Sequence, residues 1–150
     1  MPPVPQFTSD LEIVAIGEGL RDLTLPKSAW THAAHFAAAL WLLTLHPKAD
    51  AANVMPPLIR AYNESTGVAN TGSSGYHETI TQASLRAACA FLGKHSHLPL
   101  HAVCNELLAS PLGNSGWLLD YWSRALLFSP EARAVWTEPD LRPFPYPLAE

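Results

Sequence analysis

Three histidines and a glutamate stand at spacings that could build a metal site. His32 and His35 are three positions apart in an apolar stretch, so on a helix both imidazole rings would lie on one face. His77 and Glu78 follow a segment rich in Gly and Ser and would open another helix, which in this hypothesis faces the first one across the bundle. Three imidazoles and a carboxylate suit Zn(II), Fe(II) or Mn(II). The candidate metal ligands are therefore His32, His35 and His77.

A metal ion at this place would make the protein a metal-binding protein or a metal-dependent enzyme. In that hypothesis Glu78 also ligates the ion or acts as a general base, and Tyr76 or Arg124 orients a substrate. The candidate catalytic residues are Glu78, Tyr76 and Arg124. The chain lacks both the carboxylate and Glu-x-x-His set of the di-iron bundles and the His-Glu-x-x-His of zinc proteases, so no established metal motif supports the assignment.

A second hypothesis needs no metal. The loop 65–75 and the helix that follows it could bind a small polar or anionic molecule through backbone N–H groups. Arg124 would supply the opposite charge. The side chains that would assist are those of Asn70, Thr71, Ser74 and Tyr76. The loop lacks a P-loop or dinucleotide-binding fingerprint, and turn chemistry alone also explains its composition.

The third interpretation is structural. His32 would bond to a neighbouring backbone group, His35 would be a satisfied core histidine, and His77 with Glu78 would stabilise a helix start. In this case the protein would be a ligand-binding or interaction module. One form of such a module is a homodimer whose interface buries tryptophan side chains.

The elements that would position these residues are all expected to be helices. Apolar residues recur at helical spacing, and no stretch alternates apolar and polar residues as a strand does. A break is expected at Pro56-Pro57, because proline lacks the backbone donor and crowds the preceding turn. The expected helices cover 9–16, 26–45, 49–61, 73–93, 98–109, 116–128 and a short segment opened by Ser129-Pro130-Glu131.

These elements predict an all-α fold: a compact bundle of about six or seven helices. Its central helix should be 26–45, which is apolar nearly all round in its second half. The length of 150 residues suits a single domain over 1–150. An N-terminal arm is expected at 1–7, and an extended, Pro-rich C-terminal strap at 139–150.

Composition argues against several classes of partner. The net charge of −4 and the scarcity of Lys and Arg leave no basic face for nucleic acid. The longest apolar run, 33–45, is too short to cross a bilayer, which argues against a membrane protein. The first residues lack the pattern of a signal peptide, so a cytoplasmic location is expected. Cys89 and Cys104 stand among apolar residues and are expected to be free core thiols.

Two motifs, WTHxxH at 30–35 and SGYHET at 74–79, are accompanied by shorter matching segments at 25–27, 62–63, 67–71, 123–124 and 127–133. Together they resemble a family of small bacterial all-helical proteins that has no assigned activity. The resemblance spans most of the chain. It implies a bacterial, cytosolic, single-domain protein, and it transfers no catalytic role, cofactor or substrate.

Overall fold

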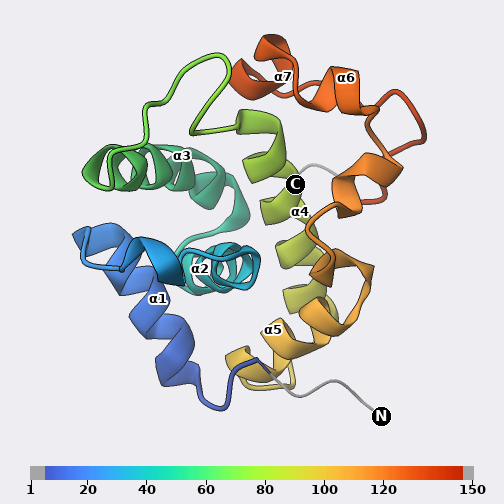
Figure 1. Cartoon of the computed structure of the whole chain (residues 1–150). Helices are drawn as coiled ribbons and strands as arrows, with labels where there is room; N and C mark the ends of the chain where they lie inside the picture. Colours follow the sequence, from blue (N-terminus) through green and yellow to red (C-terminus); the bar gives the residue numbers. More distant parts are fainter. Residues whose placement is uncertain (1–5, 147–150) are drawn as a thin grey trace.

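The computed structural model describes residues 6–146, and every regular element within that range is helical (Figure 1). The α-helices are α1 (Asp10–Asp22), α2 (His32–Leu45), α3 (Lys48–Ser65), α4 (Glu78–Lys94), α5 (Leu100–Ala109), α6 (Arg124–Leu127) and α7 (Pro130–Ala134). Short 3-10 helices cover Lys27–Ala29, Pro111–Gly113 and Trp117–Asp120. The predicted all-α fold is therefore confirmed. None of the helices within residues 6–146 has the length and apolar character that crossing a membrane requires.

The centre of the fold is α2, as predicted. It contacts α1, α3, α4 and α5, and Figure 1 shows it end-on between them. Its Phe36 and Leu40 are almost completely buried, and the small side chains of 37–39 are buried between them. Small residues at a crossing let neighbouring helices approach closely, so one helix can pack against four others.

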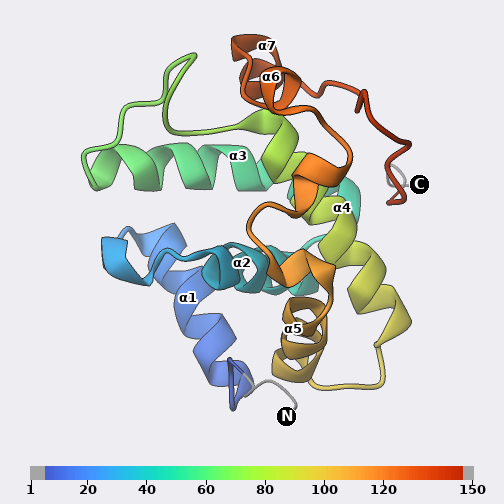
Figure 2. The same cartoon turned by 45° about the vertical axis from the view of Figure 1, so that its right-hand side comes forward.

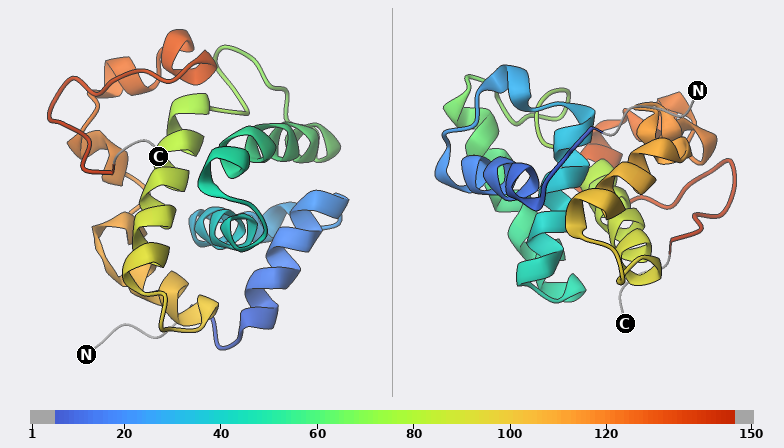
Figure 3. Two further views of the ribbon diagram at one scale, coloured as in Figure 1. Left: turned by 180° about the vertical axis from the view of Figure 1, so that it is seen from behind. Right: turned by 90° about the horizontal axis from the view of Figure 1, so that it is seen from below.

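The helix α4 connects the two ends of the molecule. Its first turns lie beside α7 and its last turns beside α5, as the front and back views both show (Figures 1 and 3). Figure 2 shows α3 stacked over α2. The space enclosed by α2, α3 and α4 is where the candidate site lies.

The first helix is longer than predicted. We expected it to weaken at Gly17 and Gly19, but α1 continues to Asp22. Both glycines are buried, and a Cβ on Gly17 would overlap the ring of Trp41 in α2. The glycine is therefore a packing residue, since its missing side chain is what lets α1 lie against α2.

The expected helix 26–45 is divided in two. A 3-10 turn covers Lys27–Ala29, and the chain then becomes extended at Thr31 before α2 begins at His32. The Thr31 hydroxyl accepts from the Ala34 amide at 3.2 Å. This N-cap satisfies a donor that the first helical turn leaves free, so α2 begins six residues later than predicted from Pro26.

The predicted break at Pro56-Pro57 is wrong, because α3 runs without interruption through both prolines. Pro56 has no N–H for the carbonyl of Ala52 four residues earlier. The side chain of Gln82, on α4, donates to that carbonyl instead at 2.9 Å. The hydrogen bond lost within α3 is therefore replaced by one that ties α3 to α4.

The start of α4 and the segment 116–128 also differ from prediction. The N-cap of α4 is His77, not Ser73 or Ser74, because Gly75 turns the chain at a φ of 78° before the helix begins. Residues 116–128 form a 3-10 turn followed by the one-turn α6. The predicted start of α7 at Ser129 is confirmed, and its hydroxyl accepts from the Ala132 amide at 3.2 Å.

The chain ends contribute to the core as far as they are described. Phe7 is buried and its amide donates to Asn105 in α5, whereas the rest of the predicted arm up to residue 5 lies outside the described residues. Residues 140–142 and 145–146 are bends, and the ring of Phe144 lies 5.2 Å from that of the fully buried Trp122. The remainder of the predicted strap, 147–150, is likewise outside the described part of the chain.

Candidate functional site

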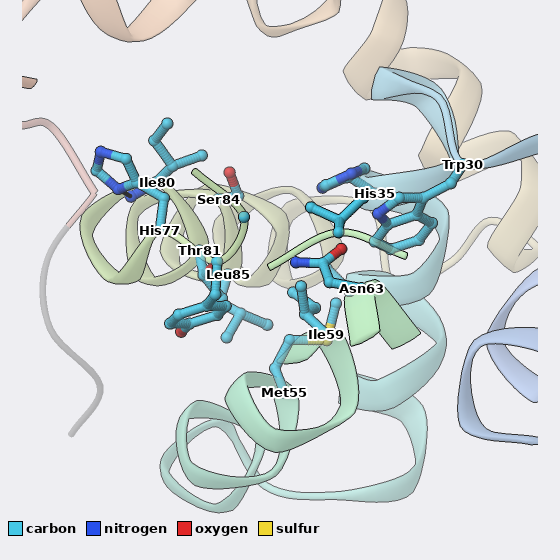
Figure 4. A pocket seen from close by; sticks show the side chains of 14 residues that line it. Trp30, His35, Met55, Ile59, Asn63, His77, Ile80, Thr81, Ser84 and Leu85 are labelled. Carbon is cyan, nitrogen blue, oxygen red and sulfur yellow. Dashed lines mark hydrogen bonds between the residues drawn. The ribbon is translucent and has the colours of Figure 1, made fainter. Parts of the chain in front are cut away.

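A cavity of about 380 Å³ lies between α2, α3 and α4 (Figure 4). Most of its lining is apolar, with Met55 and Ile59 contributed by α3 and Leu85 by α4. Its polar lining residues are His35, Asn63, Tyr76, His77, Thr81 and Ser84. No Asp, Glu, Lys or Arg is among its described lining residues, so the cavity presents hydrogen-bonding groups without a formal charge.

The imidazole of His35 is the distinctive polar group of this cavity. It stacks on Trp30 with the ring centroids 3.9 Å apart and the planes at 27°. Trp30 is held in turn by an edge contact to Tyr62, whose hydroxyl donates to the Leu25 carbonyl at 2.9 Å. Neither ring nitrogen of His35 makes a hydrogen bond to any residue within 6–146. His35 is therefore fixed in position by ring stacking, with its polar atoms unused.

Burial keeps His35 uncharged. Loss of solvent around the ring, reinforced by the neighbouring His32, lowers the pKa of His35 to about 4. A neutral imidazole has one N–H donor and one nitrogen acceptor. At neutral pH His35 thus offers one donor and one acceptor in a largely apolar space.

A second cavity of about 330 Å³ lies on the other side of His35. His35, Ile80 and Ser84 line both spaces, so these three residues form the wall that the cavities share. The second cavity is closed by aromatic and aliphatic residues of 115–128, and Arg124 lies at its edge. The exposed guanidinium of Arg124 lies 5.8 Å from the ring centre of Phe128. Arg124 is therefore near His35 but does not belong to the same cavity as Tyr76.

His77 uses both ring nitrogens within the protein. Its Nδ1 accepts from the Ile80 amide at 3.1 Å, which caps α4, and its Nε2 donates to the Leu127 carbonyl at 2.6 Å. These bonds define a neutral ring protonated on Nε2. Burial accordingly lowers the pKa of His77. Figure 4 shows His77 and His35 at opposite ends of the cavity wall.

The candidate metal ligands do not converge in this arrangement. The Nε2 of His32 lies 2.8 Å from the Leu112 carbonyl, and that ring faces the second cavity. Because both ring nitrogens of His77 are hydrogen-bonded, His32 and His35 are the two candidate ligands that retain a free ring nitrogen. Within residues 6–146 no group of three or more His, Cys, Asp or Glu side chains is placed to hold a metal ion.

Tyr76, which lines the central cavity, is paired with Glu78, which does not. The Tyr76 hydroxyl donates to a Glu78 carboxylate oxygen at 2.5 Å, and the Gln82 amide approaches the other oxygen at 3.4 Å. Burial and this bond raise the pKa of Tyr76. The carboxylate of Glu78 is therefore engaged by Tyr76 and by Gln82 of α4, and it does not line the cavity where His35 lies.

The loop residues expected to bind a ligand hold the loop together. Asn70 accepts from the Tyr76 amide at 2.9 Å and from the Asn63 side chain at 3.0 Å, and it donates to the Arg60 carbonyl. Ser74 donates to the Ala69 carbonyl at 3.1 Å. Thr71 is exposed and accepts from the Ser73 amide. Asn70 and Thr71 both line a hollow at the surface.

Sequence reasoning missed Asn63, Thr81 and Ser84 as cavity residues. Thr81 and Ser84 follow His77 at helical spacing, so a correct start for α4 would have placed them on the same face. Arg60 and Arg133 were missed too, because they lie 73 positions apart on α3 and α7 and no local pattern connects them. Only the folded chain brings them together.

Comparison of the chain with models of protein families, with curated proteins and with solved structures found no match.

Proposed function

We propose that this protein binds a small, uncharged, largely apolar molecule in the cavity between α2, α3 and α4, and that His35 recognises it. The observation that supports this proposal is the unpaired His35 ring. The ring is half-buried, and its nitrogens, which no residue within 6–146 pairs, are open to the solvent of the cavity that it lines; a ligand can take the place of that solvent. A ligand carrying a donor and an acceptor would satisfy both ring nitrogens.

The lining of the cavity restricts the ligand. A volume of about 380 Å³ falls within the range of pockets that hold small organic molecules, about 300–1,000 Å³. A charged ligand would lose its hydration without gaining an opposite charge, because no described lining residue carries one. The flat rings of Trp30 and His35 favour a planar group stacked against them.

A set of three probes of similar shape tests the ligand class: benzamide, benzoate and benzamidine. We expect saturable binding of the neutral benzamide, measured by tryptophan fluorescence and by amide shifts of residues lining the cavity, and much weaker binding of the two ions. His35→Asn should weaken benzamide binding about tenfold, which corresponds to one buried hydrogen bond. His97→Gln, at an exposed position outside the cavity, is the matched control.

Two results would overturn the proposal. One is that no compound in a library of neutral fragments perturbs the resonances of the cavity residues. The other is stoichiometric Zn, Fe or Mn in protein purified without a histidine tag, lost in both His32→Ala and His35→Ala. That second result would favour the metal site expected from the sequence, with the two histidines that retain free nitrogens as its ligands.

A further inference from the structure

A separate hollow of about 390 Å³ lies on the outer side of Tyr76. Tyr76 lines this hollow as well as the central cavity, so its ring separates the two. Unlike the cavity, the hollow carries charged side chains: Arg60 from α3, Arg133 from α7 and Glu64 from α3. The residues Thr71 and Gly72 of the loop complete one side of it.

Arg133 is held in position by the loop. Its Nη1 donates to the Gly75 carbonyl at 3.0 Å and approaches the Tyr76 carbonyl at 3.4 Å. Its Nε is buried and has no hydrogen-bond partner, which is true of no other buried side-chain N or O atom in the described residues. Solvent does not reach this Nε, whereas Nη2 has no hydrogen-bond partner within residues 6–146 and is the nitrogen of a fixed guanidinium that can donate to an anion in the hollow that Arg133 lines.

Arg60 brings a second positive charge to the same hollow. Its guanidinium lies over the ring of Tyr76, 4.6 Å from the ring centre, which orients the group without neutralising it. Within residues 6–146, neither Arg60 nor Arg133 has a carboxylate within 4.0 Å, whereas Arg21 is paired with both Glu18 and Asp22. Two guanidinium groups that form no ion pair within residues 6–146 therefore line one hollow together with a single carboxylate, that of Glu64, in a chain whose net charge is −4.

We infer that this hollow binds a small anion that carries a phosphate or carboxylate group, held between Arg60 and Arg133. Both groups present paired oxygens that match the fork of a guanidinium. The Thr71 hydroxyl accepts from the Ser73 amide and lies 3.5 Å from the Ser73 hydroxyl, and at its exposed position it can turn its proton to the anion. The carboxylate of Glu64 repels negative charge, so a singly charged anion fits better than a highly charged one. This inference does not depend on a ligand at His35, which does not line the hollow.

Titration of ¹⁵N-labelled protein tests the site with inorganic phosphate and with acetate, each against chloride at equal ionic strength. We expect saturable shifts in the Arg133 Nε–H resonance and in the amides of 70–72. Stronger binding of phosphate would identify a phosphorylated ligand, and stronger binding of acetate a carboxylate. Shifts that chloride reproduces would overturn the inference.

Arginine variants localise the site. Arg60→Gln should weaken binding of the better anion about tenfold or more, because a hydrogen bond to a charged group is lost. Arg60 is exposed, so this variant should fold normally. Arg124→Gln, at an exposed arginine of the second cavity, is the matched control. Glu64→Gln should tighten binding. Equal affinity in Arg60→Gln and Arg124→Gln would overturn the inference, because general charge would then explain the shifts.

Discussion

The imidazole of His77 joins the start of α4 to the end of α6, because its Nε2 donates to the Leu127 carbonyl at 2.6 Å. The same ring caps α4 through Nδ1 and the Ile80 amide. One side chain therefore orders two elements that are 50 residues apart in sequence. Burial lowers the pKa of His77 and so favours the neutral ring, and the double role leaves that ring no nitrogen for a metal ion.

Replacing His77 should separate its two roles. His77→Ala removes the cap and leaves the Leu127 carbonyl without its donor, so we expect a loss of about 2–4 kcal/mol in the free energy of unfolding. His77→Asn keeps an N-cap acceptor and should lose about half as much. Urea denaturation measures both. Equal stability of the two variants would mean that the cap contributes nothing.

The neutral state of His35 makes stability depend on pH. The unfolded chain takes up a proton at His35 below about pH 6.5, whereas the folded chain does so only near pH 4. Protons therefore bind preferentially to the unfolded chain between these values. Stability should fall as the pH decreases from about 6.5 to about 4, by at most about 3 kcal/mol.

The comparison that isolates this effect uses His35→Gln, which cannot titrate. Its unfolding free energy should depend less on pH over the same window, whereas His97→Gln, at an exposed position, should retain the slope of the original chain. The unfolding free energy of His35→Gln should still depend on pH to some extent, because burial also lowers the pKa of His77. An unchanged slope in His35→Gln would show that His35 is accessible to protons in the folded state.

The bond from Gln82 to the Ala52 carbonyl should stabilise α3 only because Pro56 is present. Gln82→Met removes the donor, and we expect a loss of about 1–3 kcal/mol for the unsatisfied carbonyl. Pro56→Ala restores a backbone amide that can bond to the same carbonyl within α3. In that background Gln82→Met should have little effect on thermal or urea unfolding. Additive losses in the double variant would disprove this compensation.

The fold class and most helices could be predicted from the sequence because apolar spacing is a local signal. The central position of α2 followed from its apolar character all round, and the start of α7 followed from Ser129 and Pro130. The predicted helix boundaries were wrong where a residue distant in the sequence determines them. Gln82 lets α3 continue through Pro56, and Trp41 explains why Gly17 does not end α1.

The candidate site could be predicted only in part, because local spacing reveals its residues but not their distant partners. The sequence identified His32, His35 and His77 as polar residues in helical surroundings, but it could not show that Leu112 and Leu127 offer carbonyls to two of them. Those contacts span 80 and 50 residues. The unpaired state of His35 is a property of the whole fold, and no spacing within the sequence expresses it.

The contact between Gly17 and Trp41 gives a prediction whose sign opposes helix propensity. Alanine is about 1 kcal/mol more favourable than glycine inside a helix, so propensity alone predicts that Gly17→Ala stabilises α1. A Cβ at this position would instead overlap the Trp41 ring, which is buried between α1 and α2. We expect a net loss of about 1–3 kcal/mol as the two helices are forced apart.

Gly93, in the last turns of α4, is the matched control for this substitution. It is exposed, and a Cβ there would meet no atom within 4 Å. Gly93→Ala should therefore raise the free energy of unfolding by up to about 1 kcal/mol, following propensity. Urea denaturation of the two variants should thus give shifts of opposite sign. A stabilising Gly17→Ala would mean that α1 and α2 do not approach at this point, and the packing of the central helix would then need a different explanation.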